Sequence, residues 1–339
     1  MASFPETSAA TLSFDDLADV ERYLERRGWL EPGERVQAIA RAGEGNMNLA
    51  LRVTTSSRSV IVKHGRPWVE KYPSIPAPAD RTLIEADWYA IASRKPTVAS
   101  RIPKLLDVDR DAKVLMLTDL GARGDYLHLY TGGRLTEREL DLLVDWLVNL
   151  HIGFRDDRHA ARLSNLEMRK LNHEHIFEVP FQERNGLDLD AITPGLAAAA
   201  SDLRTDEQLM DAIRRLGECY LADGVTLLHG DYYPGSWLQA DEPWIIDPEF
   251  GFYGPPEFDV GVMLAHLRLA AQPAGLCDRL LQHYRSDIPD LSTPLAEAFA
   301  GVEMLRRLLG VSQLPVTFDL AGKRDLIEHG KRLVSAANA

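Results

Sequence analysis

The sequence predicts an α+β protein with two lobes, a small strand-rich lobe followed by a larger and mainly helical one. Up to about residue 118, short apolar runs alternate with turn residues, which is the pattern of strands. Beyond Gly121 the apolar residues recur instead at the spacing of helices. A chain of 339 residues also exceeds what one core usually organises. We therefore expect one domain over residues 1–120 and a second over residues 121–339.

The first lobe is expected to begin with a helix over residues 14–28, where Leu17, Val20 and Leu24 share one face. Strand-like runs then follow at residues 35–41, 48–54, 58–63, 104–108 and 114–117. After the third run, a group of prolines excludes a regular helix, namely Pro67, Pro73, Pro76 and Pro78. A helix that contains Glu85 is expected after this proline-rich loop.

The second lobe is expected to be built from helices. Thr136 with Glu139 forms a capping box, the start signal of a helix whose apolar residues continue to His151. Further helices are expected at residues 205–222, 257–270, 275–285, 294–309 and 323–336. A β-hairpin is expected between the first two of these, from strand-like runs at residues 225–228, 237–239 and 244–246.

Net charge and targeting signals narrow the classes of function. The 38 Lys and Arg residues against 51 Asp and Glu residues leave a formal net charge of −13. Binders of nucleic acid or anionic membranes usually carry excess positive charge, so both classes are disfavoured, whereas an acidic surface would suit a cationic ligand. The N-terminus lacks the basic and apolar segments of a signal peptide, and no apolar run is long enough to span a membrane. Cys219 and Cys277 fit two reduced thiols, so we expect a cytoplasmic protein.

The segment that carries chemistry is residues 227–250, LLHGDYYPGSWLQADEPWIIDPEF. It places Asp231 in a loop after one apolar run, and Asp247 and Glu249 after the next. If the chain folds back between them, the three carboxylates come close together at one site. Because like charges repel, a bound cation is needed to keep all three ionised. Magnesium is usually held by one or two carboxylates plus substrate phosphates, and a carboxylate free of metal can orient a hydroxyl and accept its proton. Taken singly, Asp231 would be better explained as a turn residue, and Asp247 as a cap before Pro248; it is their combination that favours a functional site.

The triplet His229-Gly230-Asp231, followed by a strand that ends in an acidic residue, resembles the catalytic segment of the aminoglycoside phosphotransferase and choline kinase superfamily. That superfamily has a protein-kinase-like fold with two lobes in the order expected here. Within it the chain is most similar to 5-methylthioribose kinases, and the matches extend from about residue 40 to residue 333. The shared motifs are HGD-x4-Ser, DPEF-x-FYGP-x-x-FD-x-G over residues 247–261, GEGNMN over residues 43–48, IVK at residues 61–63 and the pair Arg306-Arg307.

The resemblance implies a role for each acidic residue of the motif. In kinase-like enzymes the protein mostly positions the reactants and neutralises charge. Asp231 would orient the acceptor hydroxyl and take its proton. Asp247 and Glu249 would bind Mg²⁺.

Three further residues lie in or near this motif, and two of them are expected to support the loop. Ser236 stands where the superfamily more often has asparagine, a difference that 5-methylthioribose kinases share, and the alternative to a metal contact is a turn hydroxyl. His229 is expected to pack and hydrogen-bond beneath the loop, and Asp259 to accept hydrogen bonds from backbone N–H groups of the loop.

The nucleotide side of the site follows from the same resemblance. Lys63 would hold the α- and β-phosphates of ATP and pair with Glu85, although an apolar strand that ends in lysine is common in itself. The further residues that the resemblance places on the nucleotide are Gly43, Gly45 and Asn46 in the glycine turn and Thr118 and Leu120 in the hinge. Their simpler interpretations are a plain hairpin turn and an ordinary strand between the lobes.

The acceptor side is implied to contain Arg306 and Arg307, because paired arginines contact the substrate side in 5-methylthioribose kinases. Arginine near a helix C-terminus is also favourable for the helix dipole alone. Tyr233 is expected to contact the acceptor. Tyr232, Tyr233 and Pro234 in the catalytic loop, and Glu257 in the FYGP run, depart from the family pattern, and all are expected near the acceptor pocket.

We expect an ATP- and Mg²⁺-dependent kinase that phosphorylates a hydroxyl of a small sugar-like molecule, as the resemblance to 5-methylthioribose kinases implies. One alternative is an aminoglycoside-type antibiotic kinase, which the acidic charge would suit and the positive pair Arg306-Arg307 would oppose. Another is a nucleotide-binding pseudokinase, which the complete set of catalytic groups disfavours. Because 5-methylthioribose kinases form dimers, a homodimer is plausible.

Overall fold

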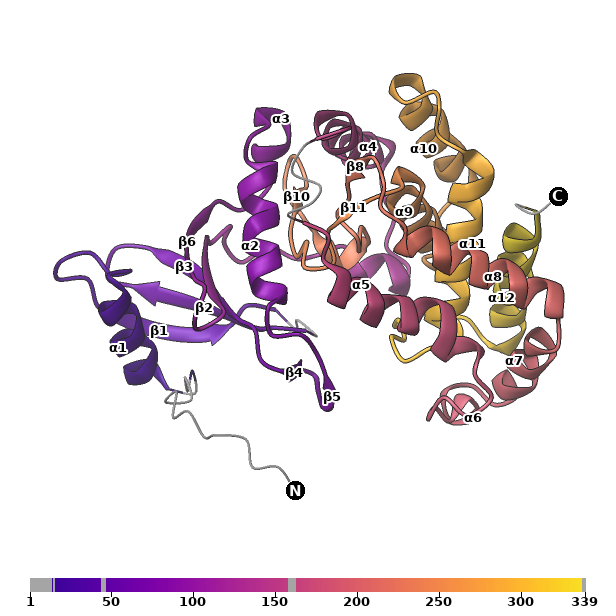
Figure 1. Ribbon diagram of the computed structural model, residues 1–339, viewed down its shortest axis with the longest axis horizontal. Coiled ribbons are helices and arrows are strands. Elements are labelled where there is room, and N and C mark those ends of the chain that lie inside the picture. Colours follow the sequence, from indigo (N-terminus) through magenta and orange to yellow (C-terminus); the bar gives the residue numbers. More distant parts are fainter. Residues whose placement is uncertain (1–13, 15, 44–46, 158–162, 337–339) are drawn as a thin grey trace. The chain divides into compact units, whose positions relative to one another are not determined.

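The computed structural model describes residues 14, 16–43, 47–157 and 163–336 (Figure 1). The chain divides into two compact units, one of residues 1–86 with 104–121 and the other of residues 87–103 with 122–339. The first unit holds an antiparallel sheet of five strands, and the second is mainly helical. The predicted α+β class is thereby confirmed.

The first unit is built on a sheet with the strand order β1-β2-β3-β7-β6, in which each neighbouring pair is antiparallel. Its strands are β1 (Val36–Arg41), β2 (Leu49–Thr55), β3 (Ser59–His64), β6 (Leu105–Asp109) and β7 (Val114–Thr118). Each closely matches a predicted run. Along β2, Leu49, Leu51 and Val53 are buried between less buried neighbours, because successive side chains of a strand point to opposite faces.

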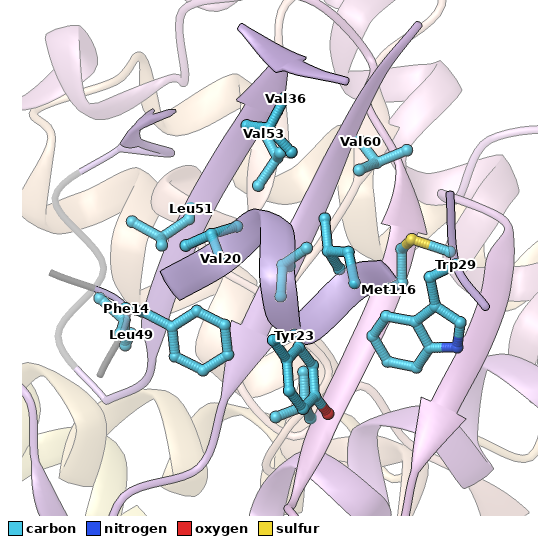
Figure 2. Close-up of a cluster of buried hydrophobic side chains, with 13 residues drawn as sticks. Phe14, Val20, Tyr23, Trp29, Val36, Leu49, Leu51, Val53, Val60 and Met116 are labelled. Carbon is cyan, nitrogen blue, oxygen red and sulfur yellow. The ribbon is translucent and has the colours of Figure 1, made fainter. Parts of the chain in front are cut away.

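Helix α1 (Leu17–Arg27) covers the apolar face of this sheet, and Figure 2 shows Val20 of the helix among the strand side chains. The helix begins at Asp16, whose carboxylate accepts a hydrogen bond from Asp19 N at 2.8 Å. It ends at Gly28, which adopts the left-handed conformation at φ 67°. Because Val20 is 0% exposed, this cluster forms the core of the first unit.

The proline-rich segment is more regular than the loop that the sequence predicts. It forms a small hairpin of β4 (Trp68–Val69) and β5 (Tyr72–Pro76), with Pro76 opposite Trp68. Proline lacks a backbone N–H, so it is tolerated in a two-stranded ribbon, where only one edge of each strand is paired. The helix that follows is α2 (Arg81–Ala92), which begins in the first unit and ends in the second.

Helices dominate the second unit. Its α-helices are α3 (Pro96–Ala99), α4 (Glu137–Gly153), α5 (Leu166–His173), α6 (Leu189–Ile192), α7 (Leu196–Arg204), α8 (Glu207–Leu221), α9 (Pro256–Leu269), α10 (Ala274–Asp287), α11 (Thr293–Leu309) and α12 (Leu320–Ala336). Single turns of other helix types are η1 (Leu127–Thr131), η3 (Glu174–Glu178), η4 (Val179–Phe181) and η5 (Pro234–Ser236). Helices α5, α6 and α7 are not predicted, because helices of 8, 4 and 9 residues show few apolar periods. Within the described residues, no helix is both long and apolar enough to cross a membrane.

The centre of the second unit is the packing of α9 against α11, with α12 on the other side of α11 (Figure 1). Nearly every residue of α9 is buried, so this helix exposes almost no surface to solvent. At the crossing, a Cβ on Gly261 of α9 would lie 2.7 Å from Ala296 O of α11. Glycine is therefore what allows the two backbones to approach.

Two short strand pairs flank the segment with the clustered carboxylates. Strands β9 (Trp237–Leu238) and β10 (Trp244–Ile245) pair with each other, which confirms the predicted hairpin over this part. The run at residues 225–228 does not join that hairpin. Its strand β8 (Thr226–Leu227) pairs instead with β11 (Tyr253–Gly254), a partner that lies beyond the carboxylates in sequence. The prediction of one three-run hairpin is wrong in this respect.

An aromatic cluster supports the backbone after β8. Trp88 Nε1 donates a hydrogen bond to Leu228 O at 2.9 Å. The rings of Trp146 and Tyr232 stack with centroids 5.6 Å apart, and Trp237 packs against Tyr232 at 5.4 Å. Because all of these aromatic side chains are buried, the loop after β8 lies on a rigid base.

The capping box at the start of α4 gives a prediction for stability. Thr136 Oγ1 accepts a hydrogen bond from Glu139 N at 3.2 Å, and Thr136 N donates to Glu139 Oε2 at 2.9 Å. Thr136→Ala removes the first of these, so we expect the free energy of unfolding to fall by about 1 kcal/mol. Thr136→Ser keeps the hydroxyl and serves as the control. Urea denaturation followed by circular dichroism measures both, and an alanine variant as stable as wild type would contradict the capping role.

Candidate functional site

The loop after β8 carries the triplet His229-Gly230-Asp231 and turns sharply at its glycine. Gly230 has a φ of +83°, in the left-handed region that other residues rarely adopt. A Cβ at this position would also lie 2.1 Å from Phe250 O, far inside the van der Waals limit. The backbone angle and the available space both require glycine between the histidine and the aspartate.

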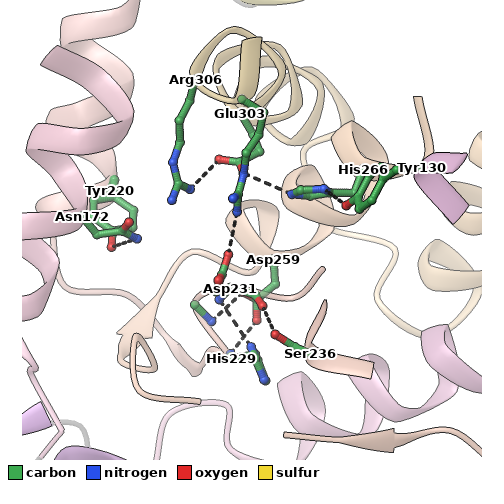
Figure 3. Close-up of polar contacts among 12 residues, drawn as sticks. Tyr130, Asn172, Tyr220, His229, Asp231, Ser236, Asp259, His266, Glu303 and Arg306 are labelled. Atoms are coloured by element: carbon green, nitrogen blue, oxygen red, sulfur yellow. Dashed lines mark hydrogen bonds and ion pairs between the residues drawn. The ribbon is translucent and has the colours of Figure 1, made fainter. Parts of the chain in front are cut away.

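A buried carboxylate from α9 fixes this turn (Figure 3). Asp259 is 0% exposed, and it accepts hydrogen bonds from His229 N at 2.7 Å and Gly230 N at 2.9 Å. On its other side, His151 Nε2 lies 3.3 Å from Asp259 Oδ2, and His151 Nδ1 lies 2.6 Å from Tyr284 OH. The prediction that Asp259 holds the loop through backbone N–H groups is confirmed.

His229 is buried and ties the loop to the next strand. Its Nε2 lies 2.9 Å from Ile246 O, and because a carbonyl only accepts, Nε2 carries the proton. Its Nδ1 then accepts the long hydrogen bond from Asp231 N at 3.4 Å. Burial lowers the pKa of His229, which favours this neutral form. The expectation that His229 packs and hydrogen-bonds beneath the loop is confirmed.

The side chain of Asp231 projects from this loop and is 21% exposed. Arg307 Nη2 lies 3.3 Å from its Oδ1. Burial raises the pKa of Asp231, and the positive charges of Arg307 and Arg306 oppose that shift. A partly exposed carboxylate that the loop holds in place can accept a hydrogen bond from a hydroxyl group.

Ser236 uses its polar groups inside the loop. Its Oγ donates a hydrogen bond to Asp231 O at 2.9 Å, and its carbonyl accepts one from Ile246 N at 3.0 Å. The residue is 2% exposed. This geometry agrees with a turn hydroxyl that braces Asp231.

Asp247 and Glu249 flank Pro248 directly after the β9–β10 hairpin. Asp247 has a φ of +62°, a left-handed angle that aspartate and asparagine tolerate better than other side chains. Glu249 is 9% exposed, and Asn165 Nδ2 donates hydrogen bonds to the backbone O atoms of Glu249 and Gly251, each at 3.0 Å. The backbone that carries the second carboxylate is therefore held from inside the unit.

The chemistry of this pair suits a hard cation, because both side chains offer carboxylate oxygens. Among the described residues, however, no group of three or more His, Cys, Asp and Glu side chains is arranged to hold a metal ion. The expected cluster of Asp231 with Asp247 and Glu249 does not form such a group. Two carboxylates are nevertheless what Mg²⁺ uses when substrate phosphates and water supply its other ligands.

Arg306 and Arg307 end helix α11, and each is only 7% exposed. Arg307 Nε donates to Glu303 Oε1 at 2.6 Å, and Arg306 Nη1 donates to Glu303 Oε2 at 2.9 Å (Figure 3). Burial would raise the pKa of Glu303, but the two arginines hold it well below its usual range. Arg307 Cζ also lies 5.1 Å from the centre of the Tyr233 ring. The structure thus brings the arginine pair and Tyr233 to the side of Asp231.

Glu303 is a residue of this site that the sequence pattern does not single out. It stands three and four positions before the two arginines, so all three side chains share one face of α11. The spacing Glu-x-x-Arg-Arg is visible in the sequence. It is uninformative by itself, because glutamates on helices are usually solvated.

In the first unit, Lys63 and Glu85 form a buried ion pair, with Lys63 Nζ 2.5 Å from Glu85 Oε1. Lys63 lies near the end of β3, where its backbone is opposite Leu115 of β7. The helix α2 supplies Glu85. The ammonium group is therefore directed by a carboxylate with very little exposure to solvent.

The other residues expected on the nucleotide are only partly described. Gly43 is exposed and has a φ of +85°, whereas Gly45 and Asn46 lie outside the described residues. Thr118 ends β7, and its backbone N donates to Lys104 O at 3.0 Å. Leu120 follows two residues later and is partly exposed.

A fully buried arginine holds the backbone at Met47 and in the segment between β3 and α2. Arg81 Nη2 donates hydrogen bonds to Met47 O at 2.6 Å and Trp68 O at 3.1 Å. Its Nη1 donates to Arg66 O at 2.7 Å and Pro78 O at 2.8 Å. The sequence does not reveal this role, because backbone carbonyls are offered by every residue type.

Two residues expected near an acceptor pocket serve other purposes. Tyr232 is 0% exposed, and its hydroxyl donates to Leu143 O at 2.9 Å. Glu257 is buried and accepts a hydrogen bond from Ser292 N at 3.0 Å. Consecutive residues of a loop point in different directions, so Tyr233 turns toward the arginine pair while Tyr232 enters the core. Tyr232 and Glu257 thus use their polar atoms within the protein, whereas Tyr233 faces the arginine pair.

The chain is similar in sequence to known phosphotransferases. Residues 38–293, more than half of the chain, match the model of a family described as the phosphotransferase enzyme family. A methylthioribose kinase of Exiguobacterium sibiricum is 27% identical over 344 residues, which cover 87% of this chain and 86% of the relative. A methylthioribose kinase of Yersinia pseudotuberculosis is 29% identical over 266 residues, which cover 74% of this chain and 64% of the relative. The chain therefore spans slightly less than two thirds of the length of the Yersinia protein.

Solved structures share the fold at low sequence identity. LicA in complex with AMP superposes with a TM-score of 0.56 at 14% identity, covering 94% of this chain and 97% of that one. The choline kinase LicA from Streptococcus pneumoniae gives 0.54 at 15% identity, covering 94% and 99%. An ADP-bound aminoglycoside phosphotransferase gives 0.50 at 14% identity, covering 94% and 97%.

The conformation of Gly230 gives a second prediction. Gly230→Ala forces a side chain into a left-handed angle and against Phe250 O, so we expect the free energy of unfolding to fall by at least about 1–2 kcal/mol. Gly275→Ala is the control, because an added Cβ there meets no atom within 4 Å. Thermal unfolding of both variants measures the effect. A Gly230→Ala protein that melts with wild type would show that the loop accommodates a side chain.

Proposed function

The chain belongs to the phosphotransferase enzyme family, and from this premise we propose that it transfers the terminal phosphoryl group of ATP to a hydroxyl of a small sugar-like acceptor. The family match and the relatives confirm the superfamily that the sequence motifs indicate. The class of enzyme, a phosphotransferase, follows from this membership. The nucleotide, the metal, the acceptor and the role of each residue are our proposal.

The observation that carries the proposal is the way Asp231 is held. Its loop is fixed by Asp259 and its carboxylate is partly exposed beside Arg307. Catalysis of phosphoryl transfer consists mostly of positioning and charge neutralisation. We assign Asp231 as the base that orients the acceptor hydroxyl and accepts its proton as the new O–P bond forms and the bond from the γ-phosphorus to the β,γ-bridging oxygen of ATP breaks, which releases ADP.

The proposed phosphoryl donor is ATP. Relatives of the same fold were solved with AMP or ADP, which supports an adenine nucleotide. Lys63 suits contact with its phosphates, because Glu85 fixes the direction of the ammonium group. The proposed nucleotide site is completed by Gly43, Gly45, Asn46, Thr118 and Leu120.

The proposed metal is Mg²⁺, held by Asp247 and Glu249. Both supply the hard oxygen ligands that Mg²⁺ prefers, and Asn165 braces the backbone of Glu249. When bound, the metal would neutralise charge on the phosphates. Asp247 and Glu249 would otherwise repel the phosphates, so the metal explains why the two carboxylates stand together.

The acceptor proposed first is 5-methylthioribose, because the two relatives described above are named methylthioribose kinases. Arg306 and Arg307 stand on the side of Asp231 where an acceptor would bind. Glu303 and Asp231 offset the two positive charges there, so the local balance of charge does not favour a cationic acceptor such as an aminoglycoside. An uncharged sugar with free hydroxyl groups agrees with both observations.

The acceptor is tested by measuring phosphoryl transfer from Mg²⁺-ATP to 5-methylthioribose, ribose, choline and an aminoglycoside. We expect turnover with the thiosugar and little with the two cations. Turnover with the aminoglycoside alone would refute the acceptor and leave the class of enzyme intact.

Replacement of the proposed base gives a third prediction. Asp231→Asn keeps the size of the side chain but cannot accept a proton, so we expect kcat to fall by about 10³-fold with little change in KM for ATP. Asp241→Asn is the matched control, because Asp241 is exposed in the turn between β9 and β10. Steady-state kinetics of the three proteins decides the matter. A wild-type rate in Asp231→Asn would exclude this residue as the base.

The metal assignment gives a fourth prediction. Asparagine tolerates a left-handed angle, so Asp247→Asn should keep the wild-type melting temperature. It loses a charged ligand, so we expect turnover to fall by at least about 10²-fold and the half-saturating Mg²⁺ concentration to rise. Asp247→Ala shows the effect of the backbone angle in addition to the loss of charge. Alanine tolerates the left-handed angle less well, so this variant should also lose about 1 kcal/mol of stability. An unchanged Mg²⁺ dependence in Asp247→Asn would contradict the assignment.

A further inference from the structure

Glu303 is a buried carboxylate between two buried guanidinium groups, and the proposed phosphoryl transfer makes no use of it. The residue is 1% exposed, against 7% for each of Arg306 and Arg307. Its oxygens are divided between them, with Arg306 on Oε2 and Arg307 on Oε1. A carboxylate in this position is expensive to bury and is unlike the exposed glutamates of most helices.

Glu303 is itself held by a chain of two side chains from other elements (Figure 3). His266 Nε2, from α9, lies 3.2 Å from Glu303 Oε1, and Tyr130 OH, from η1, lies 2.5 Å from His266 Nδ1. Burial lowers the pKa of His266 to about 4, so its ring is neutral and carries one proton. An ionised carboxylate only accepts, which places that proton on Nε2 and makes Tyr130 the donor to Nδ1. The hydrogen bonds therefore run in one direction, from Tyr130 through His266 to Glu303.

The planar guanidinium of Arg307 is directed by this carboxylate. Its Nε points to Glu303 at 2.6 Å, while Nη2 reaches Asp231 at 3.3 Å and the plane lies over the ring of Tyr233. Because the five N–H groups of arginine have fixed directions, fixing Nε also fixes where Nη2 points. The contact with Asp231 is the longer of the two, so it is the one that an acceptor oxygen could replace.

The charges of this group cancel. Arg306 and Arg307 carry two positive charges, and Glu303 and Asp231 carry two negative ones when ionised. Without Glu303, two buried guanidinium groups would face the single carboxylate of Asp231. The Nε of Arg306 is also buried without a hydrogen-bond partner in the described structure, so this arginine has donor capacity to spare.

We propose that Glu303 is a positioning residue for the acceptor side of the site, which holds Arg307 against Asp231 and cancels the charge of the arginine pair. Tyr130 and His266 hold Glu303 in turn. The inference rests on the proposed function, because it takes Asp231 to be the base and Arg307 to mark the acceptor. Glu303 also affects which ligands bind. With its charge present, Arg306 and Arg307 attract anions weakly, and without that charge the two arginines become a binding site for anions.

The first test needs no turnover. Inorganic phosphate is titrated by calorimetry into wild type, Glu303→Gln and the control Glu297→Gln. Glu297 lies on the same helix and pairs with Arg268 at 2.7 and 2.8 Å, outside this group. We expect phosphate to bind Glu303→Gln at least about tenfold more tightly than the other two proteins. Adding Arg307→Gln to Glu303→Gln should remove the gain, which locates the new anion at Arg307.

The second test separates positioning from a general loss of structure. We expect Glu303→Gln to lower kcat/KM for the acceptor by about 10²-fold. It should leave KM for ATP unchanged, since the proposed nucleotide residues belong to the first unit and Glu303 belongs to the second. Glu303→Asp keeps the charge and should restore part of the acceptor kcat/KM. Glu297→Gln should behave as wild type. An equal effect on acceptor and ATP would indicate a purely structural role.

A milder variant decides the matter if Glu303→Gln fails to fold. Tyr130→Phe removes only the hydroxyl at the far end of the chain, and we expect it to lower the acceptor kcat/KM about threefold at an unchanged melting temperature. Unchanged phosphate affinity or acceptor kinetics in a folded Glu303→Gln overturns the proposal, as does wild-type kinetics of Tyr130→Phe if Glu303→Gln is unfolded. A wild-type protein that phosphorylates none of the acceptors refutes the proposed function, and the phosphate titration then still decides the charge role of Glu303.

Discussion

The second unit depends on one interaction, in which the buried carboxylate of Asp259 accepts hydrogen bonds from two consecutive backbone N–H groups, those of His229 and Gly230. A carboxylate with no exposure is costly to desolvate, and it is stable here because the N–H groups of His229 and Gly230 compensate its charge. They can do so only because Gly230 turns the chain through a left-handed angle. The helix that carries Asp259 and the loop that carries Asp231 are therefore fixed by one another.

The same principle, a buried charge that is stable only through fixed partners, recurs at the end of α11. There the guanidinium groups of Arg306 and Arg307 leave water because Glu303 compensates them. The net charge of −13 consequently says little about the ligand. It describes the solvated surface, whereas the local balance of charge beside Asp231 is close to neutral.

Much of the fold follows from local sequence patterns. The strands of the sheet, the capping box at Thr136 and the long helices have periodic or terminal signals, and the HGD triplet identified the loop that Asp259 supports. The remainder depends on contacts that no local pattern encodes. Strand β8 pairs with β11 rather than joining the nearby hairpin. The sequence could not predict this pairing, because a strand of two residues carries too little pattern to identify its partner. Which of Tyr232 and Tyr233 faces the arginine pair depends on loop angles, and the use of Glu303 depends on its burial.

The contacts that shape the loop after β8 also determine when it can form during folding. His229 and Asp259 are 30 residues apart, Tyr232 and Leu143 are 89 apart, and Trp88 and Leu228 are 140 apart. Closing such distances costs chain entropy that is recovered only when the helices have docked. Helices with local signals can form early, but a partly folded chain has no means of ordering this loop. The loop that carries Asp231 is thus ordered together with the long-range contacts, and an incompletely folded chain with most of its helices would still lack this ordered loop.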